Sequence, residues 1–182
     1  MRWERLLSDV AYHCRIFSVR RHRSRQLSSG QEHDFFVIET ADWVNVVPLT
    51  ADQRVVMVRQ YRHGIGDLTL EVPAGIIDPT DASPEVAARR ELREETGYTC
   101  RTLRPLGVVH PNPAIMSNRC HVFAAHDVEW EGPPQWDHTE ELEVETVPLA
   151  AIPELIAAGG VTNALTIVAF QLLAVSRSPT GV

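Results

Sequence analysis

Three carboxylates, those of Glu91, Glu94 and Glu95, stand close together near the middle of the chain. Their spacing of i, i+3 and i+4 would place them side by side on one surface of a helix. Because like charges repel, the cluster is either a solvated face relieved by nearby arginines or a site for hard divalent cations. Mg²⁺ prefers oxygen ligands and commonly shares them with substrate phosphates. The second interpretation therefore predicts metal-assisted phosphate chemistry.

The sequence predicts a helix that carries this cluster. Ser83 and Pro84 are typical of a helix N-cap and first helical position, and Gly97 is typical of the residue that closes a helix. Between them, EVAARRELREET at 85–96 is long enough for about three turns. The three carboxylates are therefore expected on one rigid element.

Short β-branched and aromatic runs on both sides of this helix predict strands. Before the helix, the predicted strands cover 11–20, 34–40, 43–49, 54–58 and 68–72, with a polar connection at 21–31. After the helix, strands are expected near 104–110, 119–125 and 142–148, followed by helices at 151–158 and 162–176. This order predicts a mixed α/β sandwich in which helices cover a mostly β core. The regular crossover helices of a conventional βαβ nucleotide-binding fold are missing.

Length and composition exclude several classes of protein. The 182 residues suffice for about one domain with a substantial core. The 17 basic residues, all arginines, face 24 acidic ones, and a net charge of -7 disfavours binding to nucleic acid. No run is apolar enough for a signal peptide or a membrane span, and three cysteines without CxxC spacing indicate a reducing compartment. We expect a cytoplasmic protein that binds neither nucleic acid nor membrane.

The stretch from Gly75 to Tyr98 resembles the Nudix box, G-x5-E-x7-R-E-U-x-E-E-x-G-U, in which U is a bulky apolar residue. Its second half, RELREETGY, matches at every fixed position. In the first half one extra residue separates Gly75 from Arg90, and Asp81 or Ala82 stands where the family has its first Glu. We expect the extra residue in the loop before the helix, where changes of length are tolerated.

Further likeness lies outside the box. LEVPAG at 70–75 and RQYR at 59–62 are similar to segments of ADP-ribose pyrophosphatases and related nucleoside-diphosphate-sugar hydrolases. Pro113 stands fifteen residues after Tyr98, where that subfamily tends to carry a proline. The resemblance covers residues 34–176. It implies a Nudix-type α/β/α sandwich with a mixed β-sheet, preceded by an N-terminal antiparallel β extension.

The resemblance also implies roles for individual residues in metal binding and catalysis. Glu91, Glu94 and Glu95 would bind Mg²⁺, for which Mn²⁺ can substitute, with help from the backbone carbonyl of Ala74. Arg90 would orient the Glu cluster. Glu94 and Glu95 would thereby be catalytic. An acidic stretch before the penultimate strand would supply the base that activates water, and Glu140 is the first candidate, with Glu141 next.

Substrate contacts follow from the same resemblance. Arg62 would pair with a diphosphate oxygen, and Arg59 is a weaker candidate for the same task; the alternative for Arg62 is a salt bridge at the end of a strand. Relatives of this kind are usually homodimers in which aromatic side chains hold the nucleobase. The favoured residues here are Phe36 and Phe17, with Pro113 also placed at the substrate. Further aromatic candidates for the base are Phe35 and Trp43. All of these aromatics could instead belong to the core or the dimer interface.

The predicted organisation is a β extension at 1–40, for dimerisation and base recognition, followed by a Nudix hydrolase domain at 41–182. The predicted reaction is Mg²⁺-dependent hydrolysis of nucleoside diphosphate sugars, with ADP-ribose giving AMP and ribose 5-phosphate as the first expectation. The same chemistry on GDP-mannose, another sugar nucleotide or a dinucleotide is the nearest alternative. A non-catalytic sensor of ADP-ribose is an alternative from another class, which the intact box carboxylates disfavour.

Overall fold

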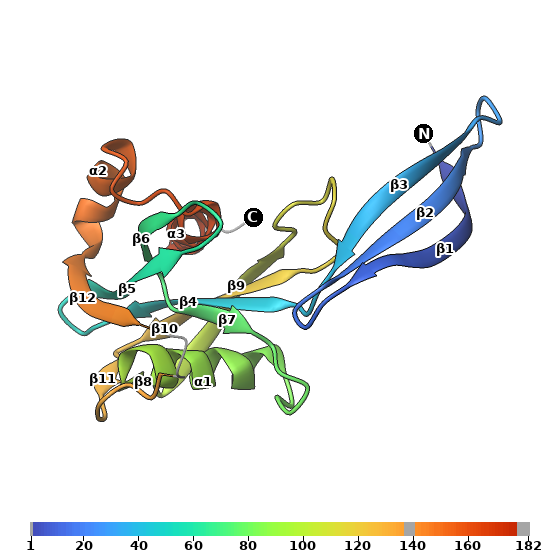
Figure 1. The fold of residues 1–182 in the computed structure, drawn as a ribbon. Helices are drawn as coiled ribbons and strands as arrows, with labels where there is room; N and C mark the ends of the chain where they lie inside the picture. Colours follow the sequence, from blue (N-terminus) through green and yellow to red (C-terminus); the bar gives the residue numbers. More distant parts are fainter. Residues whose placement is uncertain (1, 137–140, 178–182) are drawn as a thin grey trace. The chain divides into compact units, whose positions relative to one another are not determined.

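The computed structural model describes residues 2–136 and 141–177, and its contacts divide the chain into two compact units. The first unit contains Met1–Asp42 with His110–Arg119, and the second contains Trp43–Val109 with Cys120–Val182. Figure 1 labels the elements of both units. No helix in the described ranges is both long enough and apolar enough to cross a membrane.

A three-stranded antiparallel sheet forms the first unit (Figure 1, blue). It contains β1 (Trp3–His13), β2 (Ser18–Gln26) and β3 (Glu32–Glu39), in that order. Main-chain bonds attach His110–Arg119 to it, because the Ile38 N–H donates to the Ile115 carbonyl at 2.7 Å. The predicted N-terminal antiparallel β extension is confirmed.

Two predictions for this region are wrong. Residues 11–20 are not one strand, because a turn closed by the bond from the Cys14 N–H to the Phe17 carbonyl (3.0 Å) separates β1 from β2. Residues 21–31 are not merely a connection, because β2 runs through most of them and β3 begins at Glu32. The turn that ends the first strand therefore lies between His13 and Ser18, before the polar stretch at 21–31 rather than within it.

Ion pairs across the strands explain why the arginine-rich stretch forms a strand without an apolar pattern. Arg21 of β2 donates to Asp9 of β1 at 2.9 Å, and Arg20 donates to Glu39 of β3 at 2.6 Å. Opposite charges on neighbouring strands stabilise the pairing that apolar side chains would otherwise provide. A pattern of alternating hydrophobicity therefore does not find β2.

In the second unit the described residues form a seven-stranded mixed sheet. Its main path runs β12, β5, β4, β10, β9, while β6 pairs with β5 and β7 pairs with β4. The β4–β10 pair is parallel and the other pairs are antiparallel. The strands are β4 (Trp43–Leu49), β5 (Arg54–Arg62), β6 (Asp67–Glu71), β7 (Ala74–Ile76), β9 (Thr102–Val109), β10 (Cys120–His126) and β12 (Leu142–Pro148). Two short strands, β8 (Tyr98–Thr99) and β11 (Glu129–Trp130), pair separately.

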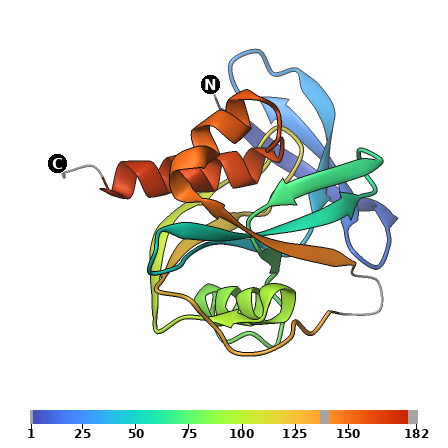
Figure 2. The same ribbon diagram turned by 90° about the vertical axis from the view of Figure 1, so that its left-hand side faces the viewer.

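Helices cover both faces of this sheet (Figures 1 and 2). Helix α1 (Pro84–Thr96) packs on one face, and α2 (Ile152–Ala157), which follows the short helix η1 (Leu149–Ala151), lies with α3 (Ala164–Arg177) on the other. Successive residues of β4 point to opposite faces. Val44 and Val46 therefore join the core under α1, whereas Val47 and Leu49 join the core under α3. The predicted α/β/α sandwich with a mixed sheet is confirmed.

Helix α1 begins and ends where its caps predict. The Ser83 hydroxyl accepts the Val86 N–H at 3.3 Å, and Gly97 ends the helix with φ 76° while its N–H donates to the Arg93 carbonyl at 2.9 Å. A Cβ at Gly97 would lie 2.1 Å from the Gly132 carbonyl oxygen, so both the positive φ and the close approach require glycine. The expected helix between Ser83 and Gly97 is confirmed.

Candidate active site

Helix α1 presents its three carboxylates toward strand β7 and solvent. The side chains of Glu91 and Glu95 are buried, with residue exposures of 8% and 4%, whereas Glu94 remains partly exposed. One oxygen of Glu95 accepts the main-chain N–H of Ala74 at 3.0 Å. This bond fixes the helix against the strand whose Ala74 carbonyl is predicted to help bind metal.

Arg90 joins the acidic residues around the start and middle of this helix. Its Nη1 donates to both Glu91 Oε1 (2.8 Å) and Glu94 Oε2 (2.9 Å). Its Nε and Nη2 form a two-point pair with Asp81 at 3.1 and 2.8 Å. The pair with Asp81 is the main reason that the pKa of Arg90 is raised. A single guanidinium therefore holds two box carboxylates in place.

Asp81 makes the ion pair to Arg90 at the place where the box pattern has its first Glu. Its side chain is 4% exposed and sits in a turn in which the Asp81 N–H donates to the Asp78 carbonyl at 2.9 Å. The other candidate, Ala82, has no charge to pair with Arg90. The extra residue of the loop thus accompanies an acid that is shorter by one methylene group.

Replacing Asp81 with Asn should make stability less dependent on acid pH. The hydrogen bonds from Arg90 lower the pKa of Asp81 in the folded protein. A lowered folded-state pKa means that the ion pair stabilises the fold above the unfolded-state value of about 3.9 and is lost as the pH falls further. The melting temperature of the wild type should be clearly above that of Asp81→Asn at pH 6, and this difference in melting temperature should become smaller below about pH 4. A difference of constant size at every pH would contradict this.

Gly75 is required because the Glu91 carboxylate lies directly on its backbone. A Cβ added at Gly75 would stand 2.1 Å from the Glu91 carboxyl carbon. Since that carbon is the far end of a flexible side chain, the helix would stay in place and the carboxylate would move away. The glycine at the start of the box therefore positions a box carboxylate through close contact.

Changing Gly75 to Ala should lower turnover by about 10²-fold with little loss of thermal stability, because a displaced carboxylate costs geometry at the reacting centre. Activity and melting temperature would be measured on the same preparation. Gly64→Ala is the matched control, since a Cβ there meets nothing within 4 Å and Gly64 has no positive φ. Equal activity of the two variants would remove Gly75 from the site.

The chemistry of these donors fits a divalent cation. Glu91 and Glu94 already converge on one positively charged nitrogen, Arg90 Nη1. Over residues 2–136 and 141–177, no group of three His, Cys, Asp or Glu side chains is close enough to hold a metal without other ligands. Mg²⁺ needs no such cage, because it keeps several waters and uses one or two carboxylates together with substrate phosphates. The hard oxygen donors of α1 match that mode of binding.

A second charged feature lies at the end of β5, where Arg62 pairs with Glu71. Its Nε and Nη2 donate to the two oxygens of Glu71 at 2.8 and 2.7 Å. Glu71 is 2% exposed and also accepts hydrogen bonds from Thr69 and Asn163. Burial acts to raise the pKa of Glu71, but the hydrogen bonds from Arg62, Thr69 and Asn163 outweigh burial, and the pKa is lowered. Glu71 is therefore a carboxylate that holds Arg62 in a fixed orientation.

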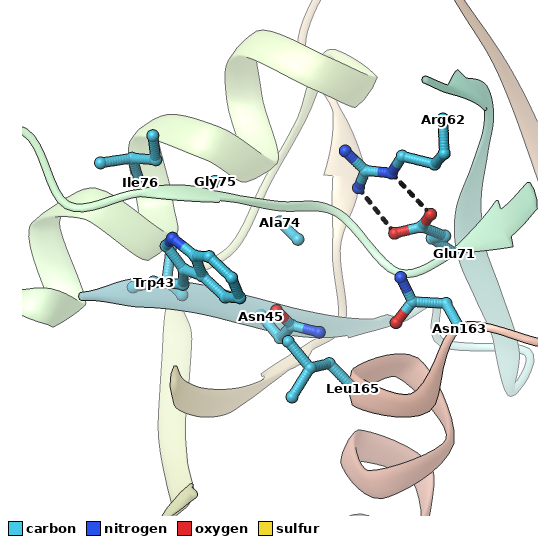
Figure 3. A pocket seen from close by; sticks show the side chains of 10 residues that line it. Trp43, Asn45, Arg62, Glu71, Ala74, Gly75, Ile76, Asn163 and Leu165 are labelled. Carbon is cyan, nitrogen blue, oxygen red and sulfur yellow. Dashed lines mark hydrogen bonds and ion pairs between the residues drawn. The ribbon is translucent and has the colours of Figure 1, made fainter. Parts of the chain in front are cut away.

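A cavity of about 380 Å³ joins Arg62 to strand β7 (Figure 3). Besides the Arg62–Glu71 pair, it is lined by Asn45, Asn163 and apolar side chains that include Trp43. Main-chain segments of Ala74 and Gly75, which contact the box carboxylates, also border it. If a ligand placed an anionic group between Arg62 and helix α1, the part of the ligand next to that group would lie in this cavity.

Arg59, the weaker candidate for the same task, lies elsewhere. It pairs with Glu145 of β12 at 2.6 Å and lines a different cavity, of about 480 Å³, together with residues of α2. Its position three residues before Arg62 puts it on the opposite face of β5. The structure does not bring the two arginines together.

The segment after β11 is fastened to the last turn of α1. The Gly97 carbonyl accepts the Glu131 N–H at 2.9 Å, and the Glu94 carbonyl accepts the Gln135 N–H at 2.8 Å. The Glu95 carbonyl accepts the Trp136 indole N–H at 3.0 Å. These acceptors are helix-terminal carbonyls that the helix itself leaves free. Gln135 and Trp136 therefore lie beside the main chain of Glu94 and Glu95.

The remaining predicted site residues fall outside this constellation. Glu140 lies outside the described residues, and the exposed Glu141 stands just before β12. Phe17, Phe36 and Pro113 belong to the first unit, whereas the carboxylates, Arg62 and the cavity belong to the second. Phe36 is 56% exposed, while the Phe17 ring packs 6.2 Å from Tyr12.

Sequence reasoning missed Glu71, Asn45 and Asn163. Glu71 is the polar residue of LEVPAG, and a charged residue before a run that ends in Pro-Ala-Gly could have marked it as a buried partner. Asn45 interrupts the apolar run WVNVVPL, which is unusual for a central strand. Asn163 caps α3, because its Oδ1 accepts the Thr166 N–H at 3.0 Å. The sequence indicates that cap but not its place beside Glu71.

Comparison with known proteins connects these features to one family. Residues 40–165 match the family described as the NUDIX domain. The chain is 30% identical over 149 residues to an ADP-ribose pyrophosphatase of Bacillus subtilis, covering 81% of this chain and 80% of that protein. It is 29% identical over 183 residues to an ADP-ribose pyrophosphatase of Mycobacterium tuberculosis (98% and 86%). A GDP-mannose pyrophosphatase of Salmonella typhimurium is 31% identical over 131 residues, 68% of each chain.

A solved structure supports the same fold. The crystal structure of an ADP compounds hydrolase superposes with a TM-score of 0.84 at 24% sequence identity. The likeness covers 97% of this chain and 94% of that one. The fold of the chain is therefore a known one.

Proposed function

This chain belongs to the Nudix hydrolase family, and from that premise we propose that it hydrolyses the diphosphate bond of nucleoside diphosphate sugars. ADP-ribose is the first substrate: water adds across its diphosphate to give AMP and ribose 5-phosphate. The observation that carries the proposal is the packing of the α1 carboxylates against Ala74 and Gly75, at the border of a cavity that also contains Arg62. The names of the pyrophosphatase relatives support the choice of substrate class.

Nudix hydrolases require a divalent metal, and we propose Mg²⁺ here, with Mn²⁺ able to substitute. Glu91, Glu94 and Glu95 would hold it, together with the Ala74 carbonyl. When bound, such an ion neutralises diphosphate oxygens and lowers the pKa of water. Arg90 keeps Glu91 and Glu94 together in the meantime, which limits the rearrangement needed for binding.

Arg62 would bind a diphosphate oxygen through Nη1. Its pair with Glu71 uses Nε and Nη2, so the third nitrogen is not part of that pair. Charge-assisted hydrogen bonds of this kind are among the stronger polar contacts. Glu140 would take a proton from the attacking water, with Glu141 as the alternative. The fastening of 131–136 to the last turn of α1 supports this role, because it holds the preceding residues at the main chain of Glu94 and Glu95.

We propose a homodimer that uses the first unit, within an organisation of a β extension at 1–40 and a Nudix domain at 41–182. Apolar side chains stand exposed on this unit, among them Leu7 (52%), Val10 (53%) and Phe36 (56%). Exposed apolar groups on neighbouring strands are typical of protein interaction surfaces. Phe36 and Phe17 would contact the base and Pro113 the substrate. The free cysteines support a cytoplasmic location.

A panel of substrates tests the proposal. ADP-ribose, GDP-mannose, UDP-glucose, NADH, diadenosine polyphosphates and dGTP would be incubated with Mg²⁺, and the products identified by chromatography. AMP with ribose 5-phosphate from ADP-ribose is the expected result. Tight binding of ADP-ribose that is recovered intact would instead indicate a sensor, and no reaction with any compound would contradict the substrate class.

A further inference from the structure

The cavity beside Arg62 contains a buried amide with unused hydrogen-bonding capacity. Asn45 is 3% exposed and lies in β4 between Val44 and Val46, both of which are fully buried. Among the described residues only Cys120 bonds to its side chain, through Sγ to Oδ1 at 3.3 Å. Its Nδ2 amino group borders the cavity. A buried amide without its hydrogen bonds is costly, which makes this group a candidate to meet a ligand acceptor.

The other walls of the cavity divide into an apolar part and a polar part. Trp43 and Leu165 provide apolar surface, and Asn45 lies between Trp43 on one side of the close-up and the Arg62–Glu71 pair on the other (Figure 3). Asn163 stands beside Glu71 and bonds to it. The arrangement offers one flat ring and an amide donor from Asn45, since the Glu71 oxygens and the Asn163 side chain are already bonded within their own cluster. These groups suit a ring that is apolar on its face and carries hydroxyls at its edge.

We propose that this cavity binds the terminal sugar of the substrate, with the sugar ring against Trp43 and a hydroxyl accepting from Asn45 Nδ2. The proposal rests on the proposed hydrolysis of nucleotide sugars and adds to it the subsite that selects the sugar. The cavity begins at the residues that would hold the diphosphate, Arg62 and Ala74, so its occupant is a direct neighbour of the diphosphate.

The place of the cavity and its amide donor favour the sugar over the nucleobase. In a nucleotide sugar the terminal sugar is bonded directly to the diphosphate, whereas the base is separated from it by a ribose, and this cavity begins at Arg62 and Ala74. A hydroxyl group can accept a hydrogen bond, and the Asn45 amide offers a donor at Nδ2, since Oδ1 accepts from Cys120.

Two sets of substrates separate the sugar from the base. ADP-ribose, ADP-glucose and ADP-mannose share a nucleotide, whereas ADP-glucose, GDP-glucose and UDP-glucose share a sugar. Asn45→Leu, which keeps the branching of the side chain but is bulkier and has no donors, should change the ratios of kcat/KM within the first set by about 3- to 10-fold. The ratios within the second set should stay as in the wild type. A change confined to the second set would place the base in the cavity and overturn the proposal, as would no change in either set.

Trp43 provides an independent variant, should Asn45→Leu fail to fold. Trp43→Ala should change the ratios of kcat/KM within the first set by about tenfold, because it removes a large apolar contact surface. Trp43→Phe should keep these ratios close to those of the wild type, because it keeps a flat ring. Melting temperatures would be recorded for every variant. Equal effects of Trp43→Ala and Trp43→Phe on the sugar ratios would contradict stacking of the sugar on this ring.

Binding of the two products distinguishes failure of the subsite from failure of the reaction. Titration calorimetry with the full chain would measure ribose 5-phosphate and AMP separately. Asn45→Leu should weaken the binding of ribose 5-phosphate by about 3- to 10-fold and leave the affinity for AMP unchanged. If the wild type hydrolyses none of the nucleotide sugars but shows this binding pattern, the reaction is wrong and the subsite stands. If ribose 5-phosphate does not bind, or binds the variants equally well, the subsite is wrong whatever the reaction.

Discussion

Glu95→Gln should reduce kcat by about 10²- to 10³-fold while the protein remains folded. The change removes one of three adjacent negative charges that would hold the cation, so charge developing on the diphosphate is stabilised less well. The fold should survive because a glutamine carbonyl can still accept the Ala74 N–H that Glu95 accepts at 3.0 Å. Removing a buried charge from beside Glu91 and Glu94 also reduces repulsion. Turnover and thermal unfolding, measured on the same sample, test both halves of this expectation.

Glu85→Gln is the matched control for this variant. Glu85 lies in the first turn of the same helix, is exposed and pairs only at the surface with Arg89 at 3.2 Å. Such a pair contributes about 0.3 to 0.5 kcal/mol, and no effect on kcat is expected. A Glu95→Gln protein that fails to fold would show that this carboxylate is structural. A variant with wild-type turnover would show that it is not needed for the reaction.

Arg62→Ala should raise KM by about 10- to 100-fold and also lower stability by about 2 kcal/mol. The increase in KM comes from losing a charge-assisted contact with the diphosphate. The loss of stability comes from Glu71, which would remain buried with its charge and without its arginine. The loss should stay below that for a fully buried pair, because the Arg62 side chain is 41% exposed. Steady-state kinetics and thermal unfolding measure the two effects separately.

A second change in the same protein separates these roles. Adding Glu71→Gln to Arg62→Ala removes the unpaired buried charge, so the melting temperature should return toward that of the wild type while KM stays high. Recovery of both would mean that KM rose only because the fold was weakened. Arg104→Ala, at an exposed position of β9, is the control for loss of an arginine and should leave both quantities unchanged. An unchanged KM in Arg62→Ala would remove Arg62 from the site.

The parts of this protein that could be predicted from sequence depend on neighbours along the chain. The caps Ser83 and Gly97 and the spacing of Glu91, Glu94 and Glu95 are local, and the helix that they define is found where expected. The strand runs were located by β-branched residues, which mark strands that contribute to a core. Most of strand β2 is not predicted from the sequence, because its arginines are stabilised by acidic partners on neighbouring strands and not by a local apolar pattern.

The missing parts of the site depend on contacts that no local pattern encodes. Glu71 could be seen as a charged residue in a strand, but its bonds to Arg62 and Asn163 join a hairpin to the start of α3. Asn45 could be seen as polar, but the cavity beside it exists only once β4, β7 and α3 are assembled. Asp81 was one of two candidates until the geometry of Arg90 chose between them. Each case required a spatial partner.

The attachment of residues 131–136 to helix α1 depends mainly on main-chain groups rather than on the identity of the side chains. All three acceptors are main-chain carbonyls of the helix end, and two of the three donors are main-chain N–H groups. Main-chain groups survive substitution, so most changes at 131–136 would leave the main-chain bonds in place, whereas the Trp136 indole bond and the added bond from Arg93 to the Glu131 carboxylate depend on side chains of the segment. The place of residues 131–136 along the end of α1 is therefore less sensitive to substitution than the side chains that these residues carry.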